Sequence, residues 1–231
     1  MLFNKLHTYV TGVLFLFTAT VSSPVLAEYG LNLTQGVTPI SQEVYDLHMT
    51  ILWVVTLIGV GVFGVMFWSI FHHRKSKGAV AAQFHHSTGA EIAWTIIPIL
   101  ILVAMAVPAT QVLIKMEETE DTEMTIKITG YQWKWHYEYM DEGFGFFSAL
   151  DSKSNEIRQL KSGMDPNEHE NYLLDVDNPV VVPTNTKIRL LTTAADVIHA
   201  WWVPALGWKR DAIPGFINDN WTIINEPGTY R

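Results

Sequence analysis

Residue types that can do chemistry gather in three short segments of this chain. The segment Tyr131–Tyr139 alternates aromatic and polar residues, His199 lies among apolar neighbours, and Glu91 opens a long uncharged run. The 231 residues contain no cysteine. For the chain as given, this excludes disulfides, zinc–thiolate sites, thiol nucleophiles and a blue-copper site, whose geometry depends on a thiolate.

The segment Tyr131–Tyr139 alternates with the period of a β-strand. One face of that strand would carry the aromatic residues Tyr131, Trp133, Trp135, Tyr137 and Tyr139. The other would carry the polar residues Gln132, Lys134, His136 and Glu138. Because aromatic residues favour strands and bury large areas, this pattern is typical of a well-packed core strand. Alternation therefore groups Trp133 with neighbours that are expected to be buried.

Two ionisable residues lie in apolar surroundings. A lone histidine such as His199 is usually a core residue, and one imidazole is not a metal site, because copper sites need several ligands. Glu91 lies at membrane depth, where an ionisable group is a candidate for function. The spacing Thr88-x-x-Glu91 also fits a capping box at the start of a helix. The two roles of Glu91 are compatible.

Two uncharged runs, Met49–Ile70 and Ile92–Ile114, are each long enough to cross a hydrocarbon core roughly 30 Å thick. The loop between them holds three Lys/Arg and one Glu, so the positive-inside rule places it in the cytoplasm. Residues 1–27 are typical of a secretory signal that is cleaved after Ala27. The alternative is that this segment is a first transmembrane helix, and it is disfavoured because the apolar run is shorter than the roughly 17 residues needed to span a bilayer. A cleaved signal and the positive loop agree in placing both flanks outside.

The predicted organisation is a signal peptide (1–27), an outer segment (28–48), a first membrane helix (49–71), a cytoplasmic loop (72–91), a second membrane helix (92–114) and an outer domain (115–231). The chain has a net charge of −8, and the region Glu117–Arg231, with 10 Lys/Arg and 19 Asp/Glu, has a net charge of −9. Such a domain repels nucleic acid, so no nucleic-acid partner is expected, and it favours a basic partner.

The outer domain is predicted to be a small β-sandwich or barrel with proline and glycine in its turns. Besides Tyr131–Tyr139, the predicted strands are Met124–Thr129, Val180–Val182, Lys187–Thr192 and Trp221–Ile224. The polar segment Asp151–Glu170 is predicted to be a surface loop. The last residues open a further strand without a partner, so we expect this β domain to be incomplete at its C-terminal end.

Three longer motifs occur in one order along the chain. They are Glu91-Ile-Ala-Trp-Thr-Ile-Ile-Pro98, Gln132-Trp-Lys-Trp135, and Asp196-Val-Ile-His-Ala-Trp-Trp-Val-Pro204 with Asp211-Ala-Ile-Pro-Gly215. With the two membrane helices, they resemble subunit II of haem–copper cytochrome c oxidase. The resemblance runs from Gly30 to the last residue. It implies a membrane-anchored all-β fold class, in which a two-transmembrane-helix hairpin is followed by a cupredoxin-like β-barrel domain.

The resemblance also implies a function and its residues. Cytochrome c would give electrons to a dinuclear copper (CuA) centre, which passes them to haem a of subunit I. That subunit also holds a copper centre, and oxygen reduction there is coupled to proton pumping. Trp133 resembles the residue at which electrons enter, His199 the first histidine ligand of the copper pair, and Glu91 the mouth of a proton pathway. Glu138 and Asp196 resemble acidic residues around the cytochrome docking site.

The implied partners are cytochrome c, oxidase subunits I and III, and membrane lipid. The implied location is the bacterial inner membrane, with the C-terminal domain in the periplasm. Pro98 and Pro108, inside the second helix, agree with packing against a larger membrane partner, since neighbouring helices can satisfy the carbonyls that proline frees.

The chain departs from the family's pattern in its copper ligands. The family's remaining ligands lie in a segment Cys-x-Glu-x-Cys-x-x-x-His-x-x-Met after a Pro-Gly-x-Tyr turn, and this sequence ends at Pro227-Gly-Thr-Tyr-Arg231. We expect a C-terminally truncated sequence that binds no copper tightly. Ala200 stands where serine is common, and Phe216 where arginine is common.

Two alternatives have different consequences. A quinol-oxidase-type subunit II, a structural module without copper, would lack the copper histidine and the tryptophan that receives electrons. His199 and Trp133 favour the cytochrome c type. A sensor or adhesin with a β ectodomain explains the topology but not the three motifs.

Overall fold

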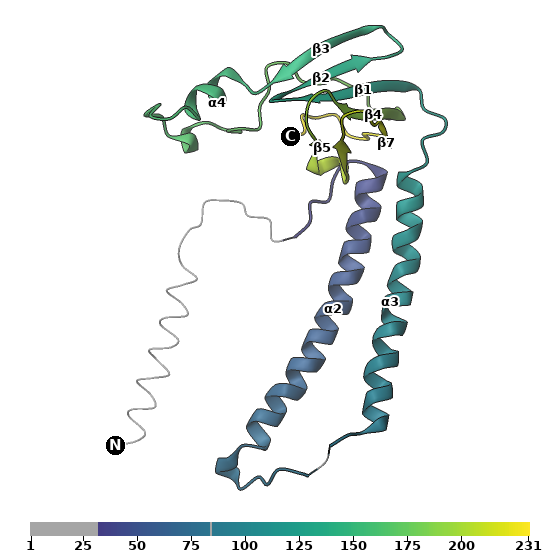
Figure 1. The fold of residues 1–231 in the computed structure, drawn as a ribbon, viewed down its shortest axis with the longest axis vertical. Helices are drawn as coiled ribbons and strands as arrows, with labels where there is room; N and C mark the ends of the chain where they lie inside the picture. The colour runs from purple at the N-terminus through teal and green to yellow at the C-terminus, as the bar shows by residue number, and fades with distance from the viewer. Residues whose placement is uncertain (1–31, 84) are drawn as a thin grey trace. The chain divides into compact units, whose positions relative to one another are not determined.

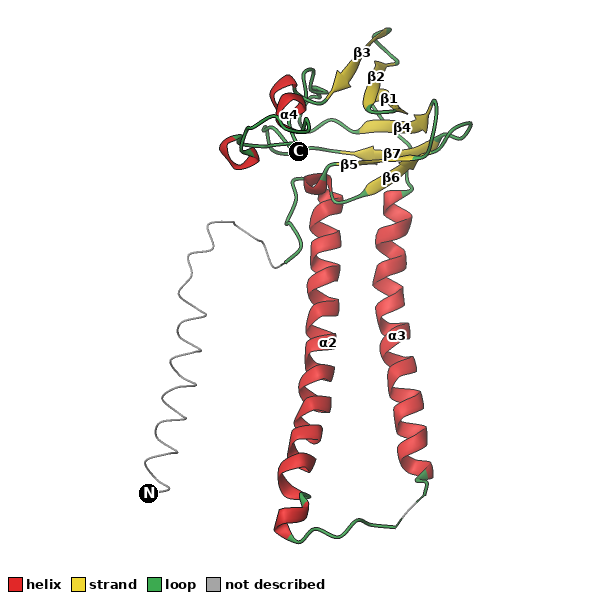
Figure 2. Ribbon diagram, turned by 60° about the vertical axis from the view of Figure 1, so that its left-hand side comes forward, coloured by secondary structure: helices red, strands yellow, loops and turns green. Residues whose placement is uncertain are grey.

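The structure, a computed structural model, describes residues 32–83 and 85–231. The predicted signal peptide (1–27) lies outside these residues. Residues Thr34–Arg231 form one compact unit. In that unit two long helices, α2 (Pro39–His72) and α3 (Thr88–Met116), precede a β domain, with a short helix η1 (Lys75–Lys77) in the connection between them (Figures 1 and 2).

Both long helices are apolar over most of their length, and their side chains are largely exposed. Each is long and apolar enough to cross a membrane, and each contains one of the predicted spans. Pro98 and Pro108 lie within α3, which continues through both. Exposed apolar side chains from Leu52 to Phe71 of α2 and from Ile92 to Ile114 of α3 indicate a surface that faces lipid or other membrane helices.

The start of α2 is fixed both by its own sequence and by the β domain. The Thr38 hydroxyl accepts from the Ser41 amide and the Ser41 hydroxyl accepts from the Thr38 amide, both at 2.9 Å, which forms a capping box. The Thr38 hydroxyl also donates to the Leu206 carbonyl at 2.9 Å, and the Val37 amide donates to the Ala205 carbonyl at 2.9 Å. The cap therefore attaches α2 to the short helix η3 (Pro204–Leu206).

The capping box predicted at the start of α3 is wrong. Ser87 is the N-cap residue, and its side chain makes no capping hydrogen bond. Thr88 is already the first helical residue, so its hydroxyl is one position too late to cap, because the cap must come from the non-helical residue before the helix. Glu91 donates its backbone amide to the Ser87 carbonyl at 3.0 Å, and its side chain is exposed.

The β domain has a five-stranded sheet in the order β3-β2-β1-β4-β7. Its strands are β1 (Met124–Tyr131), β2 (Lys134–Tyr139), β3 (Phe144–Ala149), β4 (Ile188–Ala194) and β7 (Asn218–Thr222). The central pair β1 and β4 is parallel, whereas the other pairs are antiparallel. A second sheet pairs β5 (His199–Trp202) with β6 (Lys209–Ala212).

The core forms where the central strands meet the smaller sheet. Ile126 and Ile128 of β1 and Ile188 of β4 are almost completely buried. The ring nitrogen of Trp201, on β5, donates to the Tyr137 hydroxyl of β2 at 3.0 Å. This bond satisfies two polar groups in an apolar interior, where each would otherwise lose its hydrogen bonds to water. Burial also raises the pKa of Tyr137 above its usual value.

Several predicted elements differ in the structure. Tyr131–Tyr139 is not one strand, because β1 ends at Tyr131 and β2 begins at Lys134. Val180–Val182 is not a strand: the backbone of Val181 bonds instead to the Tyr139 hydroxyl, at 2.6 Å through its carbonyl and 3.0 Å through its amide. The strand predicted at Trp221–Ile224 overlaps only the end of β7. The strands β3, β5 and β6 were not predicted.

The segment Asp151–Glu170, predicted as a loop, contains the short helices α4 (Ser152–Ile157) and η2 (Pro166–Glu168). The Asp151 carboxylate caps α4 by accepting from the Ser154 amide at 3.0 Å. This bond holds the pKa of Asp151 below its usual value. A polar composition did not exclude helices here, because polar residues at caps can start a helical turn.

Candidate functional site

Trp133 lies in a two-residue turn at the end of the β1–β2 hairpin. Tyr131 pairs with Lys134, so Gln132 and Trp133 alone connect the strands. Trp133 is 81% exposed, more than any other tryptophan, tyrosine or phenylalanine among residues 32–83 and 85–231. The alternation that grouped Trp133 with buried neighbours is wrong, because a turn residue has no fixed face. The role implied for Trp133 requires such exposure.

The Asp196 carboxylate links this turn to His199. It accepts from the Gln132 amide at 2.7 Å and from the Val197 amide at 2.6 Å, and it contacts Nε2 of His199 at 2.8 Å. The bond to His199 is the largest of the causes that lower the pKa of Asp196 to about 2. Asp196 is therefore a carboxylate, and its position fixes both the Trp133 turn and the imidazole.

The His199 ring is enclosed on two further sides. It contacts Trp135 edge-on, with ring centroids 5.7 Å apart, and it lies over the backbone of Gly130. A Cβ atom at Gly130 would lie 2.7 Å from Cδ2 of His199. The His199 side chain is 15% exposed. Glycine at position 130 is thus required by the close approach of the ring.

This arrangement determines which ring nitrogen of His199 is available for another contact. When the Asp196 carboxylate accepts a hydrogen bond from the Nε2–H group, the neutral imidazole keeps its lone pair on Nδ1. A carboxylate behind a histidine ring is also the usual way in which a metal-binding imidazole is oriented. His199 therefore fits the role of one metal ligand, with Asp196 as its orienting partner.

The other ligands of a dinuclear copper centre do not accompany His199. Within the described part of the chain, no three or more histidine, aspartate or glutamate residues are grouped so that they can hold a metal ion. A copper pair of this kind needs soft thiolate ligands, and none of the 231 residues is a cysteine. The residues present do not by themselves fit the copper pair.

We therefore predict that the purified 231-residue chain, incubated with copper and freed of excess metal, retains no copper pair. Copper analysis should give less than about one equivalent per chain, because a single imidazole binds copper weakly. The near-infrared band of a mixed-valence pair should be absent. Two copper atoms per chain together with that band would contradict this prediction, and His199→Ala is the control that assigns any weak binding.

Glu138 is not close to Trp133 along the hairpin. Glu138 lies on β2, five positions after Trp133, a distance of about 16 Å. Glu138 lies directly across from Lys127 of β1, and the charged groups approach to 3.4 Å. Both side chains are partly exposed, so the pair contributes little to stability. The Glu138 carboxylate is therefore partly neutralised by Lys127, and it lies away from Asp196.

Glu91 lies in a different part of the molecule, in the first turn of α3. From Glu91 to the end of α3 at Met116 the helix rises about 38 Å. The structure therefore brings together Trp133, Asp196 and His199, and it leaves Glu91 and Glu138 apart from them. Sequence reasoning missed Gly130 and gave Trp135 no individual role, although a glycine directly before a dense aromatic segment was a visible signal.

Comparison with known families matches two parts of the chain. Residues 124–231 match the periplasmic domain of cytochrome c oxidase subunit II, and residues 26–112 match its transmembrane domain. The chain belongs to the family of cytochrome c oxidase subunit II. This confirms the predicted family and the predicted fold class, a two-helix membrane anchor followed by a cupredoxin-like β domain. Members of this subunit II family are parts of an oxidoreductase complex.

Individual relatives agree with this assignment. The chain is 39% identical over 225 residues to a probable cytochrome c oxidase subunit 2 of Rickettsia prowazekii (strain Madrid E), which covers 96% of this chain and 68% of the relative. It is 40% identical over 193 residues to the corresponding protein of Rickettsia felis, covering 83% of this chain and 58% of that one. The chain thus spans roughly two thirds or less of the length of these relatives.

A solved structure is also similar. It is the periplasmic domain of subunit II of cytochrome oxidase (CoxB) of Bradyrhizobium japonicum, with 39% sequence identity and a TM-score of 0.40. The similarity covers 48% of this chain and 71% of that one.

Proposed function

We propose that this chain acts as subunit II of cytochrome c oxidase and receives electrons from cytochrome c at Trp133. In the complete oxidase they would continue through a dinuclear copper centre to haem a of subunit I. The haem and copper of that subunit would supply the reduction of oxygen to water, coupled to proton pumping. His199 would be one copper ligand. Because these 231 residues do not supply the others, the part proposed for this chain is docking of the donor and electron input.

The observation that carries the proposal is the position of the Asp196 carboxylate between an exposed indole and a largely buried imidazole. Hydrogen bonds of 2.7 and 2.8 Å join the Gln132 amide, Asp196 and His199, and the exposed Trp133 ring directly follows Gln132. A donor that contacts Trp133 would thus be a few covalent and hydrogen bonds from the imidazole. Such a path favours electron transfer over one through solvent.

The charge of the outer domain supports a basic donor. With a net charge of −9 over Glu117–Arg231, the domain attracts a positively charged protein and raises its rate of association. Glu138 and Asp196 contribute to this field. Since Lys127 and His199 already bond to them, we assign both residues to long-range attraction rather than to direct contacts with cytochrome c.

The helices support attachment to subunits I and III in the bacterial inner membrane, with the β domain in the periplasm. The apolar side chains in the membrane-spanning parts of α2 and α3 are exposed and need neighbours in the membrane. Glu91 would open a proton pathway into subunit I from the cytoplasmic side. Its side chain is exposed and is not part of a helix cap, so it can bond to water or to a partner.

Docking can be measured on the detergent-solubilised full chain by titration with a basic cytochrome c. A single buried interface tryptophan typically contributes about 2 kcal/mol, so Trp133→Ala should weaken binding roughly 30-fold. Binding of the unsubstituted chain should also weaken as salt screens the charges.

Trp202→Ala is the matched control, because Trp202 is also exposed, at 53%, but lies at the far end of β5. Its affinity for cytochrome c should be unchanged. Equal affinities of the unsubstituted and Trp133→Ala chains would reject docking at this turn.

A further inference from the structure

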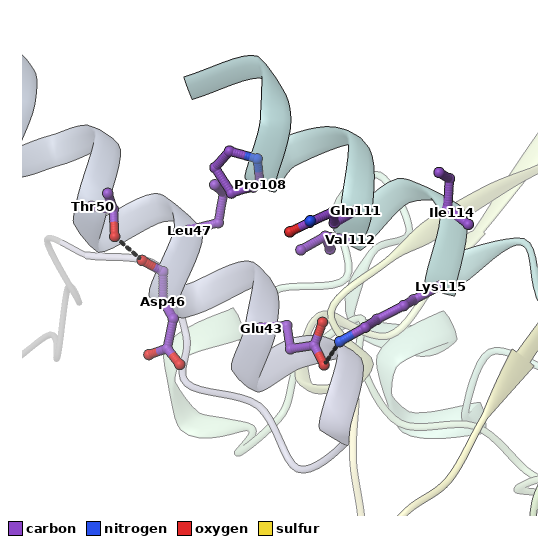
Figure 3. A pocket seen from close by; sticks show the side chains of 9 residues that line it. All are labelled: Glu43, Asp46, Leu47, Thr50, Pro108, Gln111, Val112, Ile114 and Lys115. Carbon is purple, nitrogen blue, oxygen red and sulfur yellow. Dashed lines mark hydrogen bonds and ion pairs between the residues drawn. The ribbon is translucent and has the colours of Figure 1, made fainter. Parts of the chain in front are cut away.

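A cleft of about 560 Å³ lies between the outer ends of α2 and α3. Glu43, Leu47 and Thr50 line it from α2, and Gln111, Val112 and Lys115 line it from α3 (Figure 3). Its volume is within the usual range for small-molecule sites. None of the residues implicated in electron or proton transfer lines this cleft.

The cleft lies at the depth of lipid headgroups. The uncharged run of α2 begins near Thr50, and Glu43 lies seven residues, or about 10 Å, further out along the helix. The headgroup layer on each side of a bilayer is roughly 6 Å thick, outside a hydrocarbon core of about 30 Å. The deep end of the cleft therefore reaches the acyl chains, and its rim extends through the headgroup layer to its outer side.

The rim carries one basic residue, Lys115, and two acidic residues, Glu43 and Asp46. The Lys115 ammonium donates to the Glu43 carboxylate at 2.7 Å, and Figure 3 shows the two side chains meeting between the helices. The side chains are 54% and 35% exposed, so both can accept further contacts. Below them the walls are mainly apolar, with Leu47 and Val112 on opposite helices.

We propose that this cleft binds one glycerophospholipid with a primary ammonium headgroup. The phosphate accepts from Lys115 and the ammonium donates to Glu43, which extends the ion pair to four alternating charges. The upper acyl chains pack on Leu47 and Val112. A zwitterion matches the rim because its ammonium meets two carboxylates and its phosphate meets the lysine, whereas an anionic lipid without an ammonium would leave Glu43 and Asp46 opposite a phosphate or glycerol.

The test is native mass spectrometry of the full chain released from nanodiscs that contain equal parts of phosphatidylethanolamine and phosphatidylglycerol. We expect one retained phosphatidylethanolamine per chain. Losing a hydrogen bond to a charged group should reduce this retention about tenfold in Lys115→Gln and in Glu43→Gln. Val112→Trp, which fills the cleft, should abolish it.

Leu102→Trp is the control, since Leu102 is 64% exposed on the same helix but does not line the cleft, and its lipid retention should be unchanged. Equal retention in Val112→Trp, or equal retention of both lipids, would overturn the proposal. A photoreactive residue at position 112 in the assembled oxidase should capture lipid, and capture of a polypeptide would also overturn it. None of these results depends on electron transfer.

Discussion

Gly207→Ala is expected to lower the free energy of unfolding of the β domain by about 2 to 5 kcal/mol. Gly207 has a φ of +85°, where a side chain is strained, and its new Cβ would lie 2.5 Å from Cα of Ser41. Ser41 belongs to the capping box that attaches α2 to the domain, so the backbone there must move. Denaturant unfolding in detergent, followed by tryptophan fluorescence, measures the effect.

Gly143→Ala separates the two causes. Gly143 has a φ of +72°, but a Cβ there would meet no atom within 4 Å. It should therefore show only the backbone strain, about 1 to 2 kcal/mol. If both substitutions destabilise the domain equally, the contact between Gly207 and the α2 cap has no energetic importance.

Gly130→Ala is expected to displace His199. The new Cβ would lie 2.7 and 2.9 Å from two atoms of the His199 ring and 3.1 Å from the ring of Trp135. Overpacking of this kind costs about 1 to 3 kcal/mol. Because the ring is held from the other side by Asp196, the simplest relaxation breaks the bond between Nε2 and the carboxylate.

The measurement is the NMR signal of the His199 ring nitrogens in the chain labelled at histidine. In the unsubstituted chain Nε2 should carry the hydrogen, and its bond to Asp196 should protect that hydrogen from exchange with water. Gly130→Ala should lose this protection from exchange. Gly215→Ala, in a nearby turn where a Cβ meets no atom within 4 Å, should keep it. An unchanged His199 signal in Gly130→Ala would show that the ring has more space than the structure gives it.

The two long helices could be predicted from the sequence, because an uncharged run long enough to span a bilayer can adopt few structures other than a membrane helix. The start of α3 could not, because Ser87 and Thr88 are both good cap residues and only the backbone decides between them. The cap of α2 forms with Ser41 in place of the usual glutamate or glutamine, and its further bond to Leu206 joins residues far apart in sequence.

The hairpin shows why alternation is ambiguous. A two-residue turn leaves the aromatic alternation of Tyr131–Tyr139 unbroken, although the chain reverses direction within it. In the observed register Tyr137 lies opposite Ile128, and both are buried. Tyr131 pairs with Lys134 and contacts Phe147, so it lies on the other face from Tyr137. Five aromatic residues that looked like one face therefore belong to two faces and a turn.

The candidate site was only partly predictable for a similar reason. His199 and Asp196 are three residues apart, and their bond can be anticipated from that spacing. The bond from the Gln132 amide to Asp196 joins two loops separated by 64 positions, and only the pairing of β1 with β4 brings them together. The resemblance to a known family supplied the role of Trp133, against what alternation indicated.

The most direct test of the account is the rate at which reduced cytochrome c delivers electrons to an oxidase whose subunit II carries these residues together with the copper ligands that they do not supply. It should be measured by rapid mixing at saturating cytochrome c, so that changes in affinity are excluded. Trp133→Ala and Asp196→Ala should each slow electron input by at least about tenfold, while Trp202→Ala leaves it unchanged. If both variants accept electrons as fast as the unsubstituted oxidase, electrons do not enter through the Trp133 turn.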